Sequence, residues 1–167
     1  MPETTARARL RYLFHFANDV AAMRRFYVDL LGLPEQAFED QPGFGWLCVD
    51  AGGFEAMWFR ADTRIEPATT FAAQPGWAGG TREVTSLGVE IPAARFADVH
   101  RALVATGAPL FRPVPEWRQG SYWGLSVLDP MGMTVEVYAI PATKPASTTW
   151  PGTEGGGGAA SAPTGNP

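Results

Sequence analysis

The strongest constraint on the fold is an internal repeat of one strand, one helix and three strands. Hydrophobic periodicity places the first copy at residues 10–61 and the second at residues 84–140. Residues 12–19 align with residues 86–93, and each segment leads into a helix. Residues 49–57 align with residues 128–136, and both contain a D-x-x-G turn followed by a strand. A repeat at this period predicts an α+β fold made of tandem βαβββ modules.

Periodicity also sets the expected elements. Asn18-Asp19 is predicted to cap a helix that ends near Leu31, with Gly32 as its C-terminal cap. Strands are expected at 36–39, 44–49 and 54–61 in module one. Module two is expected to hold a strand at 84–91, a helix at 93–106, a segment at 109–114, a loop at 115–120, and strands before and after the turn Asp129–Gly132.

Three segments fall outside the modules. Residues 1–9 are expected to be a flexible N-terminus, and the Gly-, Ala- and Pro-rich residues 141–167 a disordered tail. Residues 62–83 have no hydrophobic period and are predicted to be a linker or a lid. Phe71 and Trp77 within this linker either fold over a cavity or simply cover the core.

Composition excludes several classes of function. A 167-residue chain that is 46% apolar can bury one core or two small fused cores. Its net charge of −4 gives no reason to expect nucleic acid or an anionic membrane as a partner. Cys48 is the only cysteine, which excludes a thiolate-cluster zinc site. With no apolar run of membrane-spanning length and no signal-like start, we expect a cytoplasmic protein.

Glu136 is the residue on which the functional question depends. It is a carboxylate inside an otherwise apolar strand, and burying it without a partner would be costly. It is therefore either a paired or half-exposed strand residue, or a pocket residue that acts as an acid, a base or an anchor for a cationic ligand group.

Phe26-Tyr27, Leu31-Gly32-Leu33 and the later D-P-x-G-x-x-x-E of residues 129–136 resemble the vicinal oxygen chelate superfamily, which includes glyoxalase I, bleomycin-resistance proteins and extradiol dioxygenases. The resemblance covers residues 10–140. It implies two half-barrels that together form one ligand cavity, commonly within a homodimer.

The resemblance also implies that metal ligands, where present, come from the first and last strands of each module. Those positions are Tyr12, Met57, Ser86 and Glu136 here, and only Glu136 keeps a typical ligand type. His15 is expected to face the other side of its strand from Tyr12. Three ligands are therefore lacking, and we predict a site without a metal ion or other cofactor.

Aromatic residues are abundant in the predicted strands, which suits a pocket for a flat organic ligand. Arg118 is expected to be solvated, although it could contact an anionic group. The predicted function is metal-independent binding or sequestration of an aromatic or natural-product-like molecule, as the resemblance to bleomycin-resistance proteins implies. The alternative is a lyase, isomerase or cyclase that uses Glu136 as general base. The predicted ligand-binding residues are Tyr12, Phe14, Trp46, Met57, Ser86, Trp123 and Glu136.

Overall fold

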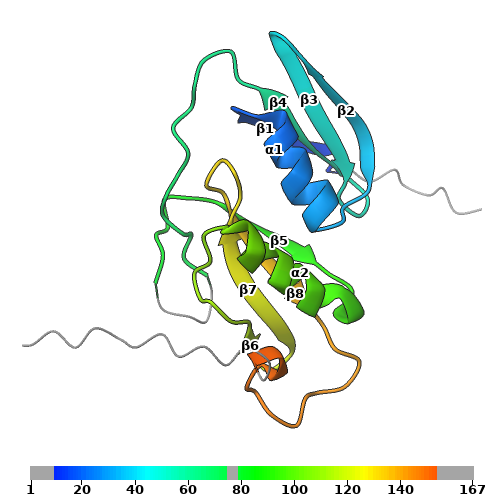
Figure 1. Cartoon of the computed structure of the whole chain (residues 1–167), viewed down its shortest axis with the longest axis vertical. Coiled ribbons are helices and arrows are strands. Elements are labelled where there is room, and N and C mark those ends of the chain that lie inside the picture. Colours follow the sequence, from blue (N-terminus) through cyan, green and yellow to red (C-terminus); the bar gives the residue numbers. More distant parts are fainter. Residues whose placement is uncertain (1–9, 75–78, 154–167) are drawn as a thin grey trace, which may run out of the picture.

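The chain forms two four-stranded sheets (Figure 1). The structure is a computed structural model, which describes residues 10–74 and 79–153. The strand orders are β1-β4-β3-β2 and β5-β8-β7-β6. The first and last strands of each module are parallel and the other neighbours antiparallel. The strands are β1 (Tyr12–Ala17), β2 (Glu35–Gln41), β3 (Phe44–Asp50), β4 (Glu55–Arg60), β5 (Ser86–Glu90), β6 (Glu116–Arg118), β7 (Tyr122–Leu128) and β8 (Thr134–Ala139). The predicted tandem βαβββ fold, with two open sheets, is confirmed.

The first helix begins and ends where the sequence predicts, but its second half is wider than an α-helix. The Asp19 side chain accepts a hydrogen bond from the Ala22 amide at 2.9 Å, which caps helix α1 (Val20–Arg24). The chain continues as the π-helix η1 (Arg25–Leu30), in which the Leu31 amide donates to the Phe26 carbonyl five residues earlier. Gly32, at a φ of 84°, ends the helix.

Helix α2 (Ala93–Thr106) covers one face of the second sheet. Its periodicity predicts an apolar face of Phe96, Val99, Leu103 and Val104; the first three are buried, whereas Val104 is 52% exposed. It is the longest helix of the described residues. None of the helices in this part of the chain is long and apolar enough to cross a bilayer.

One strand of module two is not where the sequence predicts it. Residues 109–114 form only an isolated bridge, between Leu110 and Val127, because Pro109 and Pro113 have no amide hydrogen to donate. The strand lies instead in the predicted loop. Residues 116–118 pair with residues 122–124 around a turn in which Gln119 and Gly120 both have positive φ.

The two modules contact each other through their helices, η1 and α2, and through the turn at residues 129–132. The Tyr27 hydroxyl of η1 donates to Asp129 Oδ2 at 2.8 Å, and both residues are buried. Asp129 Oδ1 accepts the amides of Met131 and Met133 at 2.8 and 2.9 Å. In Figure 1, α1 lies on the side of module one that faces α2 and β5. The Phe-Tyr and Asp-Pro motifs are therefore two halves of one contact between modules.

The described part of the linker packs against module two. The Ala72 amide donates to Thr134 Oγ1 at 2.7 Å, and the Phe71 ring contacts the Phe111 ring edge to face at 5.3 Å. Phe71 therefore packs on module two, whereas Trp77 lies outside the described residues. The linker covers one end of the second sheet.

The prediction of a disordered tail from residue 141 is wrong for its described part. Trp150 is only 9% exposed and packs against Phe96 and Trp123, with ring centroids 5.4 and 5.0 Å away. Burial of this indole attaches residues 141–150 to α2. A 3-10 turn, η2 (Pro151–Thr153), follows. The predictions for residues 1–9 and 154–167 lie outside the described residues.

Candidate functional site

One face of the module-one sheet carries aromatic side chains and is open to solvent. We call it the aromatic face, and its members are Tyr12, Phe14, Phe16, Trp46, Met57 and Phe59. The Phe14 ring lies 6.0 Å from the rings of Phe16 and Phe59, and the Phe59 ring stacks on Trp46 at 6.0 Å. Tyr12, Phe14 and Phe16 are 50–53% exposed. An apolar patch this open is typical of an interaction site.

The two-residue period of β1 separates this face from the core. Phe14 pairs with Met57 in the β1–β4 register, whereas His15 pairs with Trp58 on the opposite face. That opposite face packs against α1, and Trp58 is 1% exposed there. His15 therefore faces away from Tyr12, as the sequence predicts.

Module two presents a charged and polar cluster on its sheet, built around Glu136. We call it the Glu136 cluster. Arg118 Nη1 donates to Glu136 Oε1 at 2.8 Å and to Ser126 Oγ at 3.2 Å, and Arg118 Nη2 donates to Glu116 Oε2 at 3.1 Å. The Tyr122 hydroxyl also donates to Glu136 Oε1, at 3.0 Å. The Arg118 side chain is 6% exposed and that of Glu136 17%. The strand carboxylate thus has the partner that burial requires.

The β6–β7–β8 register brings these side chains together. Arg118 lies opposite Tyr122, and Ser126 lies opposite Glu136, so all four share one face. Gly124 lies between them, where an added Cβ would be 3.1 Å from Arg118 Cδ and 3.4 Å from Glu136 Oε1. The missing side chain at Gly124 therefore leaves the space that the Arg118–Glu136 pair occupies.

Two tyrosines beside the cluster stay protonated well above neutral pH. Burial, followed by the charge of Glu136, raises the pKa of Tyr122 to about 12. Burial and the carboxylates of Glu90 and Glu136 also raise the pKa of Tyr138. Both phenols therefore remain hydrogen-bond donors at pH 7, which suits a site that binds acceptors or holds a carboxylate in place.

Known structures share this fold. A glyoxylase/bleomycin resistance protein/dioxygenase domain from Frankia sp. EAN1pec superimposes with a TM-score of 0.55, 16% identity, and coverage of 81% of this chain and 100% of that one. The fosfomycin resistance protein FosX from Listeria monocytogenes gives 0.56, 12% identity, and 82% and 97% coverage. FosX from Mesorhizobium loti gives 0.53, 14% identity, and 80% and 92%. The chain has the vicinal oxygen chelate fold. No protein-family model matches the sequence, and no curated protein does.

Metal ions are the cofactors that the vicinal oxygen chelate fold implies, and the residues here do not fit one. Of the four expected ligand positions, Tyr12, Met57 and Ser86 offer a phenol, a thioether and a hydroxyl, which are poor ligands for a divalent cation. Glu136 already accepts a guanidinium and a phenol on Oε1. Among the residues that the structure describes, no group of three or more His, Cys, Asp or Glu side chains could hold a metal ion.

The predicted ligand-binding residues fall into three places, which are the aromatic face, the face of the second sheet that carries Glu136, and the core around Trp123. Tyr12, Phe14, Trp46 and Met57 lie on the aromatic face, and Tyr12 is exposed and not part of the core. Ser86 is exposed on β5, on the face of the second sheet that carries Glu136.

Trp123 does not join the other predicted site residues. It pairs with Ala139 on the opposite face of β7, is 7% exposed, and packs between Trp117 and Trp150. Its aromatic character suggested a cavity position, but alternation along β7 puts it in the core with Leu125.

Arg118 and Tyr122 hold Glu136 but are not among the predicted ligand-binding residues. Arg118 was expected to be solvated but is buried, because residues 115–120 were assigned to a loop. The signal lies in the spacing of Arg118, the Gln119-Gly120 turn and Tyr122. Paired as a hairpin, this stretch places Arg118 and Tyr122 opposite each other, on the face that carries Glu136.

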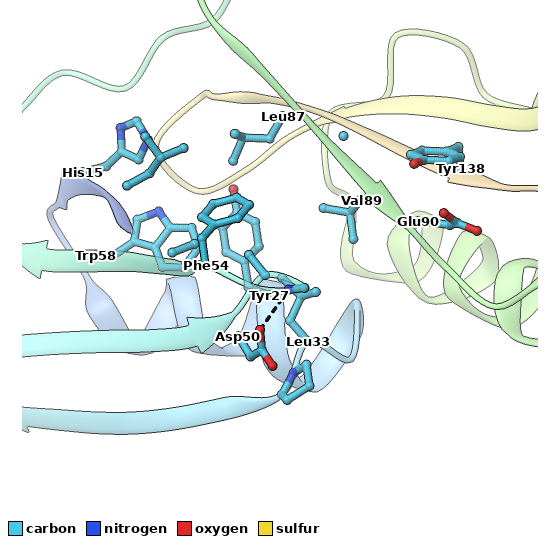
Figure 2. Close-up of a pocket in the computed structure, with 16 residues that line it drawn as sticks. His15, Tyr27, Leu33, Asp50, Phe54, Trp58, Leu87, Val89, Glu90 and Tyr138 are labelled. Carbon is cyan, nitrogen blue, oxygen red and sulfur yellow. Dashed lines mark hydrogen bonds between the residues drawn. The ribbon is translucent and has the colours of Figure 1, made fainter. Parts of the chain in front are cut away.

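The aromatic face and the Glu136 cluster are not brought together by the contact between modules. Within the described part of the chain, that contact is made by η1, α2 and the turn 129–132, which contain no member of either set. A cavity between the modules (Figure 2) is lined by none of the seven predicted residues.

Proposed function

We propose that this protein binds an aromatic or natural-product-like small molecule without a metal ion. The aromatic face forms one wall of the site and the Glu136 cluster forms the other. The half-exposed row of Tyr12, Phe14 and Phe16 is the observation that carries the proposal, because each exposed ring can stack on a planar ligand.

The Glu136 cluster would orient such a ligand. Arg118 and Tyr122 hold Glu136 in place, so the carboxylate accepts hydrogen bonds from a fixed position. Structural neighbours carry bleomycin and fosfomycin resistance in their names. Of these two antibiotics, bleomycin has aromatic rings, whereas fosfomycin is a small phosphonate with nothing to stack on the aromatic face.

The partner in this proposal is a second copy of the chain. One copy leaves the aromatic face open while its modules meet through their helices, so a second copy can bring its Glu136 cluster over the aromatic face of the first. A homodimer of this kind would contain two equivalent sites.

Calorimetric titration with novobiocin and bleomycin, in metal-free buffer, tests the ligand class, with fosfomycin as the non-aromatic comparison. Phe14→Ala should weaken binding of the aromatic compounds by about tenfold. Phe38→Ala is the control, because Phe38 is also exposed (37%, against 50% for Phe14) but lies on the other face of the sheet. Binding of fosfomycin alone, or equal effects of the two substitutions, would contradict the proposal.

A mixing experiment tests the shared site. Phe14→Ala disables one wall and Glu136→Gln the other, so each homodimer should bind poorly. Mixed dimers should regain one intact site, made from the unchanged wall of each copy. The protein should sediment at twice the 18.0 kDa of one chain. A monomer, or a mixture no better than its parts, would show that the site does not require two copies.

A second candidate is an enzyme that uses Glu136 as general base. The observation in its favour is that Tyr122 shares a hydrogen bond with Glu136, which places a proton donor and an acceptor together. Glu136→Gln keeps the shape of the side chain and removes its basicity. Turnover of a bound compound that survives this substitution unchanged would exclude this role.

A further inference from the structure

The cavity between the modules lies on the far side of β1 from the aromatic face. Its volume is about 500 Å³, which is within the range of small-molecule sites. Leu13, Trp58 and Phe54 of module one and Leu87 and Val89 of β5 supply apolar walls. Figure 2 shows Phe54, Trp58, Leu87 and Val89 around the space between the two sheets.

Trp58 gives this cavity an unused hydrogen-bond donor. The residue is 1% exposed, and its indole Nε1 is buried with no hydrogen-bond partner among the described residues. Figure 2 shows that nitrogen on the edge of the indole nearest His15, which also lines the cavity. A buried N–H without an acceptor is costly, and a ligand acceptor that reached it would remove that cost. Because the nitrogen itself is buried in the free protein, this contact requires a neighbouring side chain to move aside.

The Trp58 ring is also held in position. It stacks on Tyr27 with centroids 4.1 Å apart and planes 27° from parallel, and the Tyr27 hydroxyl is fixed by Asp129. The donor therefore keeps its direction before a ligand arrives, so binding loses little side-chain entropy.

The charged groups of the cavity are acidic. Asp50 and Glu90 line it, and its lining contains no Lys or Arg. Asp50 belongs to module one and Glu90 to module two, and Figure 2 shows them at different sides of the space. Two carboxylates at the margin of an apolar cavity favour a cation over an anion.

We propose that the inter-module cavity is a second binding site, for an aromatic organic amine whose apolar body fills the cavity, whose acceptor atom meets Trp58 Nε1 and whose ammonium group lies near Glu90 or Asp50. It shares no residue with the aromatic face or the Glu136 cluster, so it does not depend on the function proposed for them.

Propranolol and naproxen are suitable probes, because both carry a naphthyl ether but one is an ammonium and the other a carboxylate. The measurement is the indole region of the ¹H–¹⁵N spectrum, in which Trp58 is assigned by its loss in Trp58→Phe. We expect propranolol to shift the Trp58 signal downfield, as its Nε1 gains an acceptor, and to bind about tenfold or more tightly than naproxen. The Trp46 signal, from the aromatic face, reports separately on any stacking of the naphthyl ring at that face.

Variants separate the two features of the site. Glu90→Gln should weaken propranolol binding by about two- to fivefold, because Glu90 is an exposed carboxylate. Glu66→Gln, an exposed acid that does not line the cavity, should have no effect. Trp58→Phe keeps the stack on Tyr27 and should weaken binding by about tenfold.

Equal affinity for the two probes, a propranolol shift at Trp46 in place of Trp58, or no shift at saturating propranolol would overturn the proposal. Binding that survives Trp58→Phe unchanged would do the same.

Discussion

Removal of one hydroxyl group, in Tyr27→Phe, should weaken the contact between the modules. The Tyr27 ring is 1% exposed and stacks on Trp58, and phenylalanine preserves that packing. What is lost is the 2.8 Å hydrogen bond to Asp129 Oδ2, inside a buried environment. Hydrogen bonds to charged groups contribute about 1.5–3 kcal/mol, so we expect a loss of about 2 kcal/mol in unfolding free energy. For a chain of this size, that lowers Tm by about 4–8 °C.

The loss should also depend on pH. Burial is the main cause that raises the pKa of Asp129 above its usual 3.8, while the amides of Met133 and Met131 and the Tyr27 hydroxyl oppose it. Because the folded state holds its proton more tightly than the unfolded state, this carboxyl group lowers stability as pH rises from 3.8. Tyr27→Phe removes a donor that favours the charged form. Its deficit should therefore be smaller below pH 3.8 and grow above it.

Urea denaturation of the wild type and the variant, at pH values on both sides of 3.8, measures this effect. Tyr12→Phe is the control, because the Tyr12 side chain is exposed, and it should change stability by less than about 0.5 kcal/mol. A deficit for Tyr27→Phe equal to that of the control, or one that does not grow with pH, would refute the role given to the Tyr27–Asp129 contact.

Three further predictions concern stability. Gly132→Ala should lower the unfolding free energy by more than about 3 kcal/mol, because its φ is 78° and a Cβ would lie 1.8 Å from the Ala68 carbonyl oxygen. Gly43→Ala, at φ 80° with open space around it, should lower it by only about 1–2 kcal/mol. Equal thermal shifts for the two variants would disprove the contact between the linker and the turn at Gly132. Glu136→Gln should lower the unfolding free energy measured in urea by about 1–2 kcal/mol, since the amide no longer neutralises the buried Arg118. A gain in stability would count against the Arg118–Glu136 pairing. The stabilising contribution of protonated Tyr122 should be present below pH 10 and lost between pH 10 and about 12. Tyr122→Phe should therefore make the unfolding free energy less dependent on pH over that interval. An unchanged pH profile in the variant would show that the Tyr122 hydroxyl is not buried beside Glu136.

Most of the fold could be predicted because the sequence repeats it. Two copies of the same strand and helix order support each other, and local signals such as the Asp19 cap and Gly32 fix the helix ends. The alternation that separates His15 from Tyr12 is equally local. Such features depend on neighbours in sequence, so one chain is enough to predict them.

The errors come from contacts between distant residues. Trp150 is buried only because α2 and β7 offer a surface to it, and nothing near it in the sequence indicates that surface. Arg118 was missed for a related reason, since its burial depends on a three-residue strand that ends at a turn. The sequence therefore predicted which aromatic residues share one sheet face, and it missed the side chains that hold Glu136.

The account depends most on Glu136 being held by Arg118 and Tyr122 and not by a metal ion. Calorimetric titration of Mn²⁺ into the purified protein, in parallel with the Glu136→Gln variant, tests this directly. We expect no saturable Mn²⁺ binding that distinguishes the two proteins. Stoichiometric binding to the wild type that is lost in Glu136→Gln would contradict the account.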